Sequence, residues 1–140
     1  MSIKELEQLN HSIIEFYDKL SSWEQSVVKD KHFSLAQTHT IEVLGSHGAM
    51  RMKELAGRLG ITTGTLTVQV DKLVNAGFIE RRPHHSDRRS ILVELTDEGE
   101  SFYREHDDLH LSLTQDITAN LDENERAILL QCLSKMNAEF

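Results

Sequence analysis

Two histidines, His106 and His110, are four residues apart in a segment whose apolar pattern predicts a long helix. Residues at positions i and i+4 of a helix share one face, with Cβ atoms ~5–6 Å apart. Two imidazoles at that spacing can bind one Zn²⁺ at ~2.0–2.1 Å. Glu24 and His39, upstream in the chain, would complete a tetrahedral set suited to this borderline cation. These four residues are a candidate metal site, although such a histidine pair taken alone is more typical of a solvated helix face.

A second group of polar residues has the chemistry to contact DNA. Short hydroxyls and an amide at the leading end of a predicted helix suit phosphates and base edges in the major groove. Two arginines lie at the tip of a predicted hairpin, where a narrow minor groove attracts guanidinium groups. The alternative is a module that contacts proteins and leaves its threonines solvated. The candidate DNA-binding residues are Thr62, Thr63, Thr65, Thr67, Gln69, Lys72, Arg88 and Arg89.

The charge distribution supports the DNA hypothesis although the net charge does not. The chain has 15 basic and 23 acidic residues, a net charge of −8. Residues 51–90 hold eight of the basic and four of the acidic residues, a net charge of +4, so the other hundred residues carry −12. A basic segment within an acidic chain concentrates positive potential on one surface and repels polyanions elsewhere.

Length and composition indicate one soluble domain. The chain has 140 residues, of which 39% are hydrophobic and 27% charged, as in ordinary globular proteins. No apolar run approaches the ~20 residues of a membrane span, and the charged N-terminus is unlike a signal peptide. We therefore expect a cytoplasmic protein that does not contact a membrane. Cys132 is the sole cysteine, which excludes an internal disulfide, and we expect it to be buried beside Leu129 and Leu133.

The outer segments read as helices. Apolar spacings of three and four predict an amphipathic helix from Ile3 to about Lys29. Ser34 is the expected N-cap of a second helix that ends near Leu44, before a glycine-rich turn. Thr96 is expected to cap a long helix reaching about Ala119. A last helix is expected to pack the residues Ile128, Leu129, Leu133 and Met136.

The middle of the chain predicts a winged helix-turn-helix. Helices over 52–59 and 63–75, joined by a tight turn, make the helix-turn-helix. Two strand-like runs at 78–82 and 90–95 flank an arginine-tipped turn that forms the wing. The fold class is therefore mainly α with a small β-hairpin.

Three sequence motifs in this order resemble the MarR family of bacterial regulators. They are Met52–Ala56 (MKELA), Leu73–Arg81 (LVNAGFIER) and Asp87–Gly99 (DRRSILVELTDEG). The resemblance covers the whole chain and implies a single MarR-type domain, 1–140, with the winged helix-turn-helix at about 48–96. It implies dimerisation helices at about 1–34 and 97–140, and a homodimer that presents two winged helices to double-stranded DNA at a palindromic operator.

Within that family the chain is similar to the zinc-responsive subgroup, which represses zinc-uptake genes. The shared features are a late glutamate in the first helix (Glu24), Gln37-Thr-His39, and Glu105-His106 followed by His110. The resemblance implies that Zn²⁺ raises operator affinity. At the subgroup's second site, a cysteine and two glutamates, this chain has Asp30, Thr38 and Glu105, so a weaker second site is left with Asp30 and Glu105.

Two other functions compete with zinc sensing. A MarR-type repressor could be released from DNA by an aromatic small molecule, in a pocket lined by Phe16, Trp23, Phe33 and Phe102. Three histidines and a carboxylate also occur in zinc hydrolases, which need an open coordination position and a positioned base. No HExxH motif is present, and all four candidates are used as ligands, so we expect no enzymatic activity.

Overall fold

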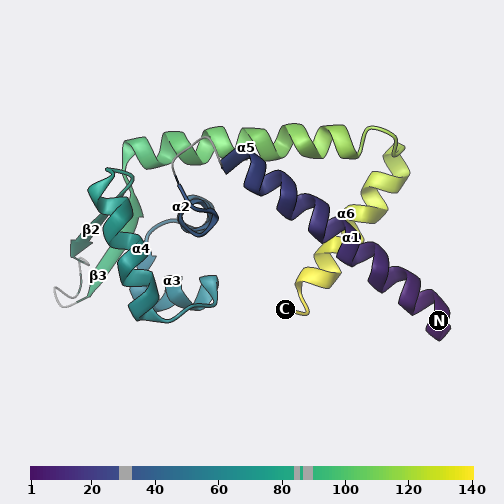
Figure 1. Ribbon diagram of the computed structural model, residues 1–140, viewed down its shortest axis with the longest axis horizontal. Helices are drawn as coiled ribbons and strands as arrows, with labels where there is room; N and C mark the ends of the chain where they lie inside the picture. Colours follow the sequence, from purple (N-terminus) through teal and green to yellow (C-terminus); the bar gives the residue numbers. More distant parts are fainter. Residues whose placement is uncertain (29–32, 84–85, 87–89) are drawn as a thin grey trace. The chain divides into compact units, whose positions relative to one another are not determined.

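The computed structural model describes residues 1–28, 33–83, 86 and 90–140. None of its helices has the combined length and hydropathy that a membrane span needs, within those described ranges. The chain forms two compact units, Met1–Glu100 and Ser101–Phe140. Figure 1 labels most of the elements, which are α1 (Ile3–Val28), α2 (Leu35–His47), β1 (Met50–Arg51), α3 (Met52–Leu59), α4 (Thr63–Asn75), β2 (Ile79–Pro83), β3 (Ile91–Leu95), α5 (Asp97–Ile117) and α6 (Glu123–Asn137).

The first unit packs helices against a small antiparallel sheet with strand order β1-β3-β2. Ile79 pairs with Leu95 and Met50 pairs with Val93. The fold class predicted from the sequence is confirmed. Strand β1 was not predicted, because two residues are too few to show an alternating pattern. The fully buried core side chains include Ile41, Leu55, Leu66, Leu73 and Val93.

Helix α2 has a defined start and a later end than its sequence predicted. Ser34 and Gln37 form a capping box, in which the Gln37 N–H donates to Ser34 Oγ (3.1 Å) and the Ser34 N–H to Gln37 Oε1 (3.0 Å). The helix does not stop near Leu44 but continues to His47. Gly45 is tolerated inside the helix. The chain therefore turns only at Gly48, whose φ of 83° favours glycine.

The start of α5 approaches the backbone that leads into β2. The Thr96 hydroxyl donates to the Gly77 carbonyl (2.6 Å) and accepts from the Gly99 N–H (3.1 Å). A Cβ added to Gly99 would lie 2.1 Å from the Phe78 carbonyl oxygen. Only a glycine lets the first turn of α5 pass the backbone this closely.

Apolar side chains of α1 and α6 are exposed in the single chain. On α6 the expected packing residues Ile128, Leu129, Leu133 and Met136 are 39–50% exposed. They therefore do not pack within a single protomer, and their packing in the expected dimerisation region stays a prediction. Cys132 on the same helix is also exposed and not buried as expected. On α1 the exposed apolar residues are Ile3, Leu6, Leu9, Ile13, Ile14, Phe16 and Tyr17.

Candidate functional site

The helix-turn-helix of the first unit fixes which face of α4 is open to solvent. Leu66, Val70 and Leu73 are fully buried, and they recur at the three- and four-residue spacing of a helix face. The opposite face is therefore exposed, and it carries Thr65 and Lys72. Figure 1 shows α4 beside the β2–β3 hairpin of the same unit.

The threonine hydroxyls at the leading end of α4 are partly used inside the protein. Thr62 is the N-cap, and its Oγ1 accepts from the Thr65 N–H at 3.2 Å. The Thr62 hydroxyl also donates to Thr65 Oγ1 (3.0 Å), and the Thr67 hydroxyl donates to the Thr63 carbonyl (2.8 Å). Because these two protons are committed, the exposed surface offers fewer free hydroxyl donors than the residue types alone suggested.

Gln69 joins α4 to α2. The side chain is half-buried, and its Oε1 lies 3.3 Å from the hydroxyl of Thr40, which is fully buried in α2. The Thr40 hydroxyl also lies 2.9 Å from the Ala36 carbonyl. Gln69 therefore makes an internal contact that the sequence pattern did not predict.

The wing is held by ion pairs at its base. Arg82 pairs with Glu94 across β2 and β3 at 2.7 Å. Arg81 pairs with Asp71 of α4, so the acidic side chain near the exposed face is compensated. The predicted wing-tip contacts Arg88 and Arg89 lie outside the described residues.

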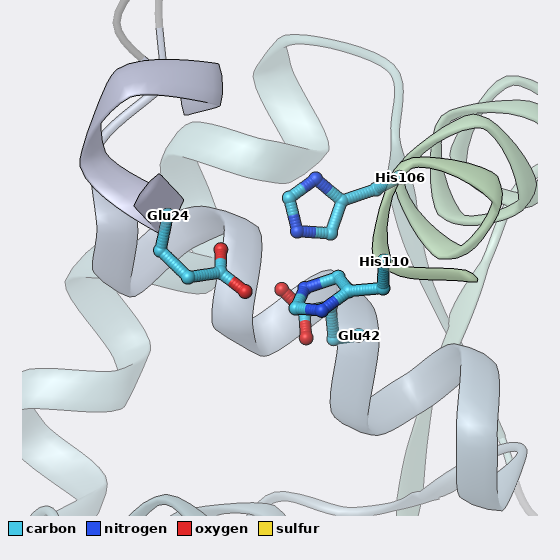
Figure 2. A group of neighbouring side chains, drawn as sticks. All are labelled: Glu24, Glu42, His106 and His110. Atoms are coloured by element: carbon cyan, nitrogen blue, oxygen red, sulfur yellow. The ribbon is translucent and has the colours of Figure 1, made fainter. Parts of the chain in front are cut away.

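In the first unit, residues of α1 and α2 line an open cavity of about 660 Å³. Its described lining includes Glu24 and His39, two of the predicted metal ligands, together with Glu42. Carboxylate oxygens of Glu24 and Glu42 lie within 4.8 Å of each other, and Figure 2 shows each on its own helix. Glu42 was missed from the sequence, although its position three residues after His39 puts it on the same helix face.

In the second unit, the other two predicted ligands lie one turn apart on α5. Ring centroids of His106 and His110 are 4.9 Å apart, and each offers a nitrogen within 4.8 Å of the other's. Figure 2 shows both rings on one side of the helix. His106 is buried, and Phe102 stacks parallel to it at 6.3 Å. The i, i+4 spacing therefore forms the imidazole pair that it predicted.

The weaker second metal site was predicted at Asp30 and Glu105. Glu105 is exposed on α5, and Asp30 lies outside the described residues. The aromatic pocket predicted for the rival function also differs from the cavity between α1 and α2. Tyr17 is the aromatic residue in its described lining, whereas Phe33 packs edge-on against Phe78 at 4.9 Å.

Comparison with known proteins identifies the family. The model of the MarR family matches residues 33–91. The crystal structure of the reduced form of MarR from E. coli is 30% identical, with a TM-score of 0.69 over 94% of this chain and 95% of that one. This chain belongs to the MarR family. The winged helix-turn-helix formed by α3, α4 and the β2–β3 hairpin agrees with this membership.

Two further relatives are similar over different extents. A MarR variant from E. coli complexed with operator DNA is 27% identical, with a TM-score of 0.71 over 97% of this chain and 99% of that one. The HTH-type transcriptional regulator PecS of Dickeya dadantii is 31% identical over 97 residues. That alignment covers 69% of this chain and 58% of PecS, so the chain spans less than two thirds of that relative's length.

Proposed function

We propose that this MarR-family member is a cytoplasmic, DNA-binding transcriptional repressor of metal-uptake genes whose operator affinity is raised by Zn²⁺. The observation that carries the DNA-binding part is the exposed polar face of α4, which three fully buried side chains hold in position. The surrounding segment has a net charge of +4, and phosphate contacts supply much of the affinity for DNA. The relative crystallised with operator DNA supports the same function.

The donor set fits zinc. We propose Glu24, His39, His106 and His110 as ligands, with Glu42 as a further carboxylate on the α2 side. Glu24, His39 and Glu42 line one cavity in the first unit, and the two histidines of the second unit face each other across one helical turn. Imidazole nitrogens and carboxylate oxygens are the ligands that zinc accepts when cysteine is absent. When bound, Zn²⁺ supplies a double positive charge that favours bringing these deprotonated groups together.

A hydrogen bond connects α2, which carries two of these ligands, with α4, which carries the proposed DNA-binding face. His39 and Glu42 flank Thr40 in α2, and Thr40 contacts Gln69 of α4. A shift of α2 that accompanies ligand binding would therefore reach α4 through a direct hydrogen bond. Zinc can strengthen operator binding only by as much as it prefers the DNA-competent state. We propose that this preference is positive, as the zinc-responsive subgroup implies.

We propose that the acting species is a homodimer on a palindromic operator. The exposed apolar residues of α1 and α6 supply a surface that a second copy can bury. Two-fold symmetry in the protein would then match two-fold symmetry in the DNA site.

Operator binding with added zinc and with a zinc chelator tests this function. Fluorescence anisotropy should show tighter binding by the wild type with zinc. His106→Ala and His110→Ala should lose that response yet keep weak, salt-sensitive binding. His11→Ala is the matched control, because His11 is an exposed histidine on α1, and it should respond like the wild type. Equal wild-type affinities with and without zinc would refute the sensor.

A second candidate function is release from DNA by an aromatic small molecule. The cavity between α1 and α2 favours it, because about 660 Å³ suits a small ligand and Tyr17, Leu20 and Leu35 line it. Glu24 and Glu42 would, however, repel an anionic phenolate there. Loss of operator binding on adding an aromatic compound, with no effect of zinc, would favour this function. Membership of a family of regulators speaks against the zinc hydrolase.

A further inference from the structure

Val68 stands out on the exposed face of α4. Its side chain is 55% exposed, although the residues on either side of it in sequence are Thr67 and the half-buried Gln69. Among the described residues of α3, α4 and the sheet, Val68 and Ile91 are the large apolar side chains that are exposed. A β-branched residue on a helix surface gives poorer helix stability than alanine, so helix formation alone does not explain its presence.

The neighbours of Val68 form a stripe with three different chemistries. Thr65, Val68 and Lys72 follow the i, i+3, i+7 spacing of one helix face. Thr65 keeps its own hydroxyl proton, because in its contact with Thr62 it is the acceptor. Lys72 supplies a cation able to reach a phosphate. Val68, between them, supplies only methyl groups.

From this stripe we infer that Val68 determines DNA sequence specificity by contacting the C5-methyl group of thymine in the major groove. That methyl is the apolar group among the hydrogen-bonding groups that base pairs present in the major groove. Valine has two methyls on Cβ and a stiff χ1 angle, so the contact costs little side-chain freedom. The inference rests on the proposed DNA-binding function and names the base that one residue of α4 reads.

The charge near Val68 is compatible with this contact. Asp71 is the acidic residue three positions later on the same helix, and Arg81 pairs with it. The committed Thr67 hydroxyl leaves the Thr67 methyl as a competing apolar group next to Val68 in sequence. Thr67 is therefore the residue against which the assignment to Val68 must be tested.

Uracil substitution tests the contact directly. Duplexes that bind the full-length wild type in the presence of Zn²⁺ are selected from a random 30-base-pair pool. In a selected sequence, symmetric pairs of thymines are then replaced by deoxyuridine, which removes the C5-methyl and keeps base pairing. The wild type should lose about fourfold in affinity per half-site at one such pair, the expected effect of one buried methyl.

Two variants assign the effect. Val68→Ala should bind thymine and uracil duplexes within about twofold of each other, as the methyl contact is gone. Thr67→Ser removes a neighbouring methyl and keeps the hydroxyl, so it should retain the full uracil penalty. Both substitutions are on the exposed surface, and circular dichroism should show that each variant folds.

The failures of the two proposals are distinguishable. A wild type that selects no sequence refutes the DNA-binding function and this inference with it. A wild type that selects a sequence yet shows no uracil penalty, or whose selected sequence lacks thymine, overturns the Val68 contact alone. A penalty lost in Thr67→Ser and kept in Val68→Ala overturns it too.

Discussion

Gly99 is a residue whose missing side chain can be tested directly. A Cβ added at this position would lie 2.1 Å from the Phe78 carbonyl oxygen. Gly99→Ala must therefore displace the backbone at the start of α5. We expect a loss of about 1–3 kcal/mol in the free energy of unfolding, the usual cost of overpacking. Urea denaturation measures it.

Gly57 provides the matched control for that substitution. It lies inside α3, and nothing is within 4 Å of an added Cβ. Gly57→Ala should therefore raise the free energy of unfolding by about 0.5–1 kcal/mol, because alanine is the better helix former. A Gly99→Ala variant as stable as the wild type would contradict the close approach.

Glu42 and His39 make a second prediction at the residue level. Both line the cavity that holds Glu24, and Glu42 is the acid that sequence reasoning missed. We expect Glu42→Gln and His39→Ala each to weaken zinc binding by about tenfold or more, the range seen when groups around a metal are altered. Competition with a chromophoric chelator measures this. An unchanged affinity in Glu42→Gln would remove Glu42 from the site.

The roles of some residues could be predicted from their neighbours in sequence, and the contacts of others could not. Ser34 and Thr96 act where the sequence placed them, because a cap depends on its own residue and a few neighbours. The internal contact of Gln69 was not predicted, because it joins segments far apart in the chain. The contact of Gln69 with Thr40 spans 29 positions, and no local pattern encodes it.

Among the helices, the hydrogen bond between α2 and α4 is the link that can be tested. Thr40→Val removes the hydroxyl contacts with Gln69 and the Ala36 carbonyl. We expect a loss of about 1 kcal/mol in the free energy of unfolding. If the link carries zinc coupling, the zinc-dependent gain in operator affinity should fall by about threefold. Urea denaturation and anisotropy measure the two effects.

Thr38→Val is the control for this link. Thr38 is also fully buried in α2, and its hydroxyl has no hydrogen-bond partner among the residues the structure describes. Valine should therefore be tolerated there, with the zinc response unchanged. A full zinc response in Thr40→Val would show that coupling takes another route.

The regular elements were predictable as types, and their packing was less so. All the helices from α1 to α6 were predicted, α1 from its amphipathic spacing, which records the face that is buried, and α2 from its N-cap and its glycine-rich end. That pattern does not say what buries the face. The apolar residues of α6 were expected to pack, yet α6 has no buried residue in the single chain.

For the whole molecule, the exposed apolar residues of α1 and α6 predict a dimer, whose stability depends on protein concentration. Leu133→Glu on α6 and Leu6→Glu on α1 place a charge where each leucine is 44% and 56% exposed in the single chain. If a second copy covers these residues, burying an unpaired charge should dissociate the dimer. Light scattering after size exclusion measures the mass. Lys135→Glu on α6 is the control, because it changes charge without removing apolar surface, and it should remain dimeric.

Val68 has a consequence for how such a protein would read modified DNA. A side chain that detects only a methyl group in the major groove does not distinguish thymine from 5-methylcytosine, which carries the same group at the same ring position. A site in which the contacted thymine is replaced by cytosine should therefore regain affinity when that cytosine is methylated. The epigenetic state of the DNA, and not its base sequence alone, would then set the occupancy of the site.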